Sequence, residues 1–183
     1  MSSEAQVVSD QIQDAPDGAP VAVPASKSMS IIVTKGSLDS AYPPFILATT
    51  AAAMGLPVTM FFTFYGLTLL FRKLDLQMTM AGNPAMKIPM MGAHIGMPNI
   101  MTAIPGVDAA CTRMMKNLMN KKGVASIQDL REMALDADVR MIACQMTLDL
   151  FEYSLDDMIE GVELGGAATY IECATQSDIN LFI

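Results

Sequence analysis

The feature that most constrains the fold is a pair of short apolar segments separated by one segment of helix length. Residues 28–34 read Ser-Met-Ser-Ile-Ile-Val-Thr and residues 58–64 read Val-Thr-Met-Phe-Phe-Thr-Phe, and both runs are typical of buried strands. Between them, residues 41–54 carry Ala, Leu and Thr at helical spacing and stop at Gly55. Strand, helix and strand in this order predict a parallel pair joined by a right-handed crossover, the unit of an α/β fold.

The remainder of the folded part continues this alternation. We expect strands at 138–144 and 179–182, helices at 67–76, 111–122, 126–136, 146–153 and 167–174, and a further helix that begins at 154. One alternating series of this length predicts a single α/β domain.

Two stretches depart from this pattern. Residues 1–28 contain three prolines, and acidic side chains dominate their charge, so we expect a disordered acidic tail ahead of a domain that spans 29–183. Within that domain, an insertion at about 78–110 is rich in Met, Pro and Gly and carries only two charged residues, Lys87 and Asp108. A long connection without clear elements tends to be functional, and the bias toward Met is typical of an interaction surface.

Composition excludes several classes of function. The net charge of −8 argues against a nucleic-acid partner, because the chain gains little from neutralising phosphates. Three cysteines without a Cys-x-x-Cys pair argue against a disulfide scaffold or a cysteine zinc site. A single histidine leaves little room for a His-dependent metal or Ser-His-Asp enzyme. The uncharged stretch from 40 to 71 is broken by Pro43-Pro44 and by Gly55-Leu56-Pro57, so no integral membrane span is predicted.

The strongest candidate for chemistry is Cys144, at the carboxyl end of the strand predicted at 138–144. Ligands of parallel sheets sit beyond such ends, where a following helix offers unpaired backbone N–H groups and a favourable dipole. These features lower the pKa of a thiol and stabilise a thiolate or a persulfide anion. From the residues alone, Cys144 is equally well explained as a nucleophile or sulfur acceptor and as a small buried packing residue.

Other candidates are weaker. Cys111 lies at a predicted helix start, where it is either a second thiol that exchanges with Cys144 or, as we favour, a small residue near a helix end. Cys173 is expected in the core. His94 and its neighbouring methionines suit Cu(I), but an interface is the better interpretation, and His94 could also give or take a proton near a thiol. We predict no metal site.

Several stretches together resemble the DsrE/DsrF/DrsH-like family, within it the longer DsrE-like sulfurtransferase branch. The resemblance rests on Ile31–Gly36, Met54-Gly55, Val58–Phe64, Met114-Met115-Lys116, Ile142–Thr147 and Gly161–Tyr170. It implies a three-layer α/β sandwich around a mostly parallel five-stranded sheet, in a single domain that forms homo-oligomers.

The resemblance also implies a function and a site. Members carry sulfane sulfur on a cysteine and pass it to partners such as TusA-like carriers, and the longer branch resembles proteins found with rhodanese-like and heterodisulfide-reductase-like components of sulfur oxidation. The reactive cysteine of the family falls on Cys144. Backbone N–H groups at Gln145, Met146 and Thr147, with the Thr147 hydroxyl and Lys35, are candidates for holding the anion, and no cofactor is required.

Two hypotheses follow from the sequence. The first is a cytoplasmic sulfur-transfer protein that carries a persulfide or thiosulfonate on Cys144, either as a sulfurtransferase-like enzyme or as a stoichiometric carrier. The second is an assembly or regulatory subunit that uses the Met-rich insertion as an interaction surface, with Cys144 merely packed. Peripheral contact of that insertion with a membrane remains a lesser expectation.

Overall fold

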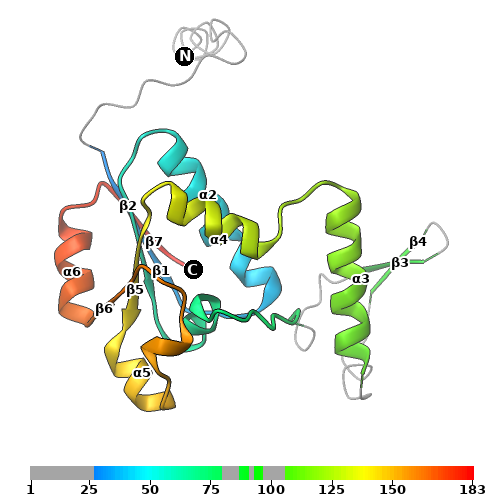
Figure 1. The fold of residues 1–183 in the computed structure, drawn as a ribbon. Helices are drawn as coiled ribbons and strands as arrows, with labels where there is room; N and C mark the ends of the chain where they lie inside the picture. Colours follow the sequence, from blue (N-terminus) through cyan, green and yellow to red (C-terminus); the bar gives the residue numbers. More distant parts are fainter. Residues whose placement is uncertain (1–26, 80–86, 91–92, 97–105) are drawn as a thin grey trace, which may run out of the picture.

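A five-stranded sheet forms the centre of the protein, in which every neighbouring pair of strands is parallel (Figure 1). The computed structural model describes residues 27–79, 87–90, 93–96 and 106–183. The strand order is β6-β5-β2-β1-β7. The strands are β1 (Met29–Val33), β2 (Val58–Phe62), β5 (Arg140–Cys144), β6 (Val162–Gly165) and β7 (Ile179–Phe182).

Helices cover both faces of this sheet (Figure 1). Helices α2 (Leu38–Ala53) and α4 (Ile127–Asp136) pack against each other on one face, while α6 (Ala167–Thr175) lies on the other. The expected α/β class with a three-layer arrangement is therefore confirmed, and the sheet is wholly parallel.

The two faces bury apolar side chains to different extents. Alternate residues of each strand point toward the α2 and α4 face, where Phe45, Met60, Phe62 and Met141 are fully buried in the main core. Each such side chain stabilises the fold by roughly 1.5–3 kcal/mol through burial. On the α6 face a smaller cluster forms from Phe61, Ile142, Cys144 and Tyr170, with Ile32, Ala174 and Cys173 partly buried against it. The site described below lies at one end of this smaller cluster.

One strand of the sheet was not expected from the sequence. β6 is only four residues long, and two of them, Glu163 and Leu164, are exposed. It lies at the edge of the sheet and pairs only with β5 among the described strands. A short, half-exposed edge strand lacks the continuous apolar run that identifies the central strands.

The expected helix at 67–76 is wrong. A 3₁₀ helix, η1 (Phe64–Leu70), occupies the first part of this stretch, and the chain then leaves regular structure. The backbone after η1 forms hydrogen bonds with other segments: Arg72 N donates to Asp157 O at 3.0 Å, and Gln77 O accepts from Leu38 N at 2.8 Å. Tertiary hydrogen bonds thus replace those that a continuing α-helix would have made.

The Met-rich insertion does contain regular elements, contrary to expectation. An antiparallel hairpin pairs β3 (Lys87–Met90) with β4 (Ala93–Gly96), and α3 (Val107–Lys121) begins before the insertion was expected to end. Figure 1 shows α3 and the hairpin beyond the sheet and the helices that cover it. Residues 80–86, 91–92 and 97–105 of the insertion, and all but the last two residues of the predicted tail, lie outside the described residues. Within the described ranges, no helix combines the length and the apolar character that crossing a bilayer requires.

Candidate functional site

Cys144 is the last residue of β5 and the N-cap of the short helix α5 (Gln145–Phe151). Its Cα is paired with Gly165 of β6, and it lies two strands away from the end of β1 because β2 intervenes. Only 4% of the residue is exposed. The thiol thus occupies the carboxyl edge of a parallel sheet, where such folds hold their ligands.

Hydrogen-bond donors from two elements surround the Cys144 sulfur. Burial alone would raise the pKa of this thiol, but hydrogen bonds from the Thr147 side chain and backbone, the Thr63 side chain and the Met146 backbone outweigh burial and lower it. Thr147 itself is fully buried. The site therefore favours the thiolate over the thiol without a positively charged side chain among these donors.

The two threonine hydroxyls are held together by the turn that follows β2. Thr63 Oγ1 and Thr147 Oγ1 are 3.1 Å apart, and the Phe64 backbone N–H donates to Thr147 Oγ1 at 3.3 Å. Phe64 has a φ of 48°, a left-handed conformation that is uncommon outside glycine. This turn aims the Phe64 N–H at Thr147 Oγ1, which leaves the Thr147 hydroxyl proton available to the Cys144 sulfur or to Thr63 Oγ1.

A close backbone approach fixes where Thr63 lies. Thr63 N donates to Val33 O at 3.0 Å, and Gly66 N donates to Thr34 O at 3.1 Å. A Cβ at Gly66 would lie 2.2 Å from Val33 O, so only glycine fits between η1 and the end of β1. The packing of η1 on β1 therefore places the Thr63 hydroxyl beside the end of β5.

The structure brings some of the predicted anion-holding residues to Cys144 and not others. Met146 and Thr147 donate to the sulfur through their backbone N–H groups. The backbone N–H of Gln145, the predicted donor, is not among the groups that lower the pKa of Cys144. The Gln145 side chain donates to Asp149 Oδ1 at 2.9 Å. Lys35 is exposed and follows β1, which is separated from β5 by β2, at a spacing of about 4.8 Å between neighbouring strands. It lines an open pocket with Ser37 and Thr68.

The remaining predicted residues lie on other elements. Cys111 is 8% exposed on α3, which Figure 1 places outside the layers that contain β5. His94 lies in β4, paired with Pro89, and its side chain is outside the described part of the chain. The ranges that the structure describes bring no three His, Cys, Asp or Glu side chains together as metal ligands.

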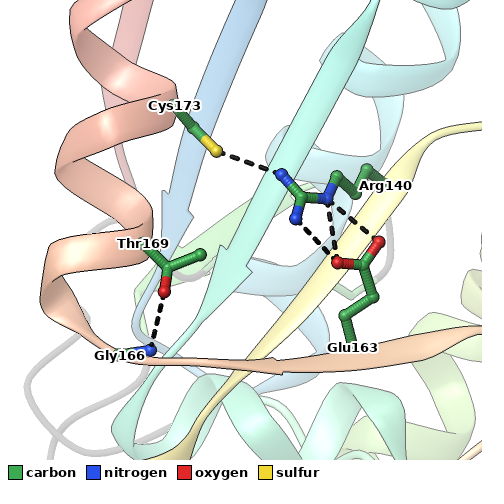
Figure 2. A network of polar contacts seen from close by, with 5 residues as sticks. All are labelled: Arg140, Glu163, Gly166, Thr169 and Cys173. Carbon is green, nitrogen blue, oxygen red and sulfur yellow. Dashed lines mark hydrogen bonds and ion pairs between the residues drawn. The ribbon is translucent and has the colours of Figure 1, made fainter.

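Cys173 has a polar environment that the sequence did not indicate. It is only partly buried on α6, which corrects the expectation of a core residue, and Arg140 Nη1 donates to its sulfur at 3.2 Å (Figure 2). The same guanidinium forms a bidentate ion pair with Glu163 of β6, at 2.7 Å for Nη2. Figure 2 also shows Gly166 N donating to Thr169 Oγ1 at the other end of α6.

Sequence reasoning missed Thr63, the second hydroxyl at Cys144. Its signal is modest: it is a polar residue at the carboxyl end of a predicted strand, directly after the buried Phe62. Its role depends on the pairing of β2 with β5, because Phe62 lies opposite Ala143 and Thr63 therefore lies near Cys144.

Comparison with known proteins decides the family, because a family model described as "DsrE/DsrF/DrsH-like family" matches residues 25–182. The chain belongs to this family. The match covers the whole sheet and the residues around Cys144. The resemblance drawn from the sequence is therefore confirmed.

Two relatives match this DsrE/DsrF/DrsH-like chain over most of their lengths. The "Sulfur carrier protein DsrE2" of Allochromatium vinosum is 55% identical over 157 residues, which cover 86% of this chain and 98% of the relative. The "Uncharacterized protein YrkE" of Bacillus subtilis is 31% identical over 162 residues, with the same coverage of 86% and 98%. A crystal structure of the E. coli ychN protein aligns with 86% of this chain and 99% of its own, at a TM-score of 0.47 and 14% identity.

Proposed function

We propose that this protein is a sulfur carrier that takes up one sulfane sulfur atom on Cys144 and hands it to a partner thiol. The observation that carries the proposal is the position of a buried thiol at the carboxyl end of β5, among donors from Thr63, Met146 and Thr147 that lower its pKa. The 55% identity to a relative whose name is sulfur carrier protein supports it.

Loading is a thiol-exchange step without net oxidation. The Cys144 thiolate attacks the outer sulfur of a donor persulfide, R–S–SH. A bond forms between Cys144 Sγ and that sulfur, the S–S bond of the donor breaks, and the donor leaves as the thiolate R–S⁻. Cys144 then carries the persulfide –S–SH, which ionises to –S–S⁻.

Unloading is the same step in reverse. A partner thiolate attacks the outer sulfur of the protonated persulfide, and Cys144 leaves as a thiolate. Because a thiol of low pKa is the better leaving group, the hydrogen bonds that favour the Cys144 thiolate also favour this release. The burial of Cys144 shields the cargo from bulk solvent. We propose a TusA-like carrier as the acceptor and the cytoplasm as the setting.

The test is sulfur loading followed by mass spectrometry. The reduced protein is exposed to polysulfide, thiosulfate or tetrathionate, and adducts are mapped on each of the three cysteines. We expect a gain of one sulfur atom on Cys144 with polysulfide, or the corresponding adduct with thiosulfate or tetrathionate, reversed by a reductant.

Matched variants make the result specific. Cys144→Ser is expected to lose the adduct, whereas Cys173→Ser and Cys111→Ser retain it. Circular dichroism confirms that all three variants are folded. If the Cys144→Ser variant gains the same amount of sulfur as the parent protein, the proposed role of Cys144 is excluded.

A further inference from the structure

Four large apolar side chains lie exposed on the elements that carry the Cys144 site. They are Phe64 (46% exposed), Tyr65 (66%), Met146 (63%) and Leu150 (60%), and we refer to them as the docking face. Clusters of exposed apolar side chains are uncommon on single soluble domains, and those with a polar border mark contact sites for proteins or membranes.

Aromatic packing and helical spacing join these four residues. Tyr65 stacks on the Phe151 ring with centroids 5.7 Å apart, and Phe64 meets the same ring edge-on at 6.5 Å. Phe151 ends α5, on which Met146 and Leu150 are four residues apart and so share one side of the helix. Phe151 therefore links the exposed rings of η1 to α5, the helix that carries Met146, Leu150 and the Thr147 donor to Cys144.

The charge on the α5 side of the docking face is negative. Residues 141–183 contain eight acidic residues and no Lys or Arg. Two of the eight, Asp149 and Glu152, are exposed beside Leu150 at the end of α5. On the η1 side, Lys35 and Asp75 both line a pocket with Tyr65, so the net negative charge belongs to the α5 side. That negative border repels the anionic headgroups of a membrane surface and attracts a positively charged protein surface.

We infer that the docking face binds a thiol-bearing protein whose cysteine is surrounded by apolar side chains and Lys or Arg residues. This inference rests on the proposed function, because the partner thiol is the group that takes sulfur from Cys144. The apolar side chains supply contact area close to Cys144, and the acidic border selects the orientation in which the partner cysteine arrives.

The experiment compares two cysteine peptides as sulfur acceptors from the loaded full-length protein. Both peptides carry the same Leu and Phe residues beside the cysteine, but Lys residues flank it in one and Glu residues in the other. We expect transfer to the Lys peptide to be roughly tenfold faster at low salt, and the difference to shrink at about 0.5 M salt.

Variants locate the effect on the molecule. Asp149→Lys with Glu152→Lys is expected to remove most of the preference for the Lys peptide, and Leu150→Gln to slow transfer to both peptides several-fold. Asp136→Lys is the control for Asp149→Lys and for Glu152→Lys made singly, because it changes the charge by the same amount as either one. It lies at the end of α4, which leads into the amino end of β5 and not into α5. It is expected to leave both rates unchanged.

The outcomes separate this inference from the proposed function. Equal rates for the two peptides, or an Asp136→Lys effect as large as that of the α5 variants, would overturn the inference while sulfur loading on Cys144 stands. Failure of Cys144 to load at all would overturn the proposed function instead. Co-sedimentation with phosphatidylserine vesicles that Leu150→Gln abolishes would identify a lipid contact and also overturn the inference.

Discussion

Cys144 and Cys173 belong to the same apolar cluster on the α6 face, yet their sulfur atoms have different partners. At Cys144 the partners are two hydroxyls and two backbone N–H groups, which carry no net charge for a carboxylate to cancel. At Cys173 the partner is the Arg140 guanidinium, which Glu163 already neutralises in part (Figure 2). The comparison teaches that a fold can lower the pKa of a buried thiol with neutral donors alone, without a cationic side chain beside it.

The largest expected effect comes from Gly66→Ala, which disrupts the packing of η1 against β1 that positions Thr63 near Cys144. A Cβ at 2.2 Å from Val33 O forces η1 away from β1, and we expect a loss of about 3 kcal/mol in the free energy of unfolding. Chemical denaturation measures this loss. Gly166→Ala is the control, because a Cβ there meets nothing within 4 Å and its φ of −101° suits alanine. Equal stability of the two variants would contradict the close approach.

Thr147→Val is expected to change the reactivity of Cys144 and not that of Cys173. It keeps the shape of a fully buried side chain but removes a hydroxyl that lowers the pKa of Cys144. We expect alkylation of Cys144 at about pH 6.5 to slow roughly tenfold, as for the loss of one hydrogen bond to a charged group. The rate at Cys173 should not change. Thr147→Ser, which retains a hydroxyl, is expected to restore much of the rate, and failure to do so would assign the effect to packing.

Glu163→Gln is expected to change the reactivity of Cys173 and not that of Cys144. It removes the negative charge that competes for Arg140, so the full positive charge of the guanidinium is left to the Cys173 sulfur. Because exposed ion pairs contribute only about 0–1 kcal/mol, we expect alkylation of Cys173 to rise two- to fivefold at most. Rates measured by peptide mapping should show Cys144 unaffected. An unchanged Cys173 would mean that Arg140 does not influence this thiol.

The smallest effect is on stability as a function of pH. Hydrogen bonds hold the pKa of Cys144 below the value of about 8.5 that an unfolded thiol has. Between these two pKa values the unfolded chain binds more protons, so this group makes stability rise with pH. Its contribution is complete above the unfolded pKa and is lost as pH falls through the folded pKa. Unfolding curves of the wild type and Cys144→Ser, both reduced, should diverge in this window, and parallel curves would contradict the lowered pKa.

The sequence predicted the part of the site that depends on local patterns. The buried run at 58–64 and the strand at 138–144 identified central strands, and the placement of Cys144 at a strand end followed from them. Thr63 could not be assigned to the same site, because its role depends on the pairing of β2 with β5, some 80 residues apart in the chain.

The missed features share this non-local origin. Phe64 adopts a left-handed backbone only because η1 packs on β1, and no residue type at that position signals it. Cys173 looked like a core residue because its helix is apolar, whereas its partner Arg140 lies 33 residues earlier. β6 was hidden because an edge strand needs no continuous apolar run.

The outermost pairing of the sheet has a consequence for how the molecule is made. β1 pairs on one side with β7, which follows it by about 150 residues, so all of the intervening segments must be synthesised before that ladder can close. Ser30 of β1 also contacts Tyr170 of α6, whose ring packs near Cys144. The edge of the sheet beside β1 therefore closes after the donors to the Cys144 sulfur, Thr63, Met146 and Thr147, have all been synthesised.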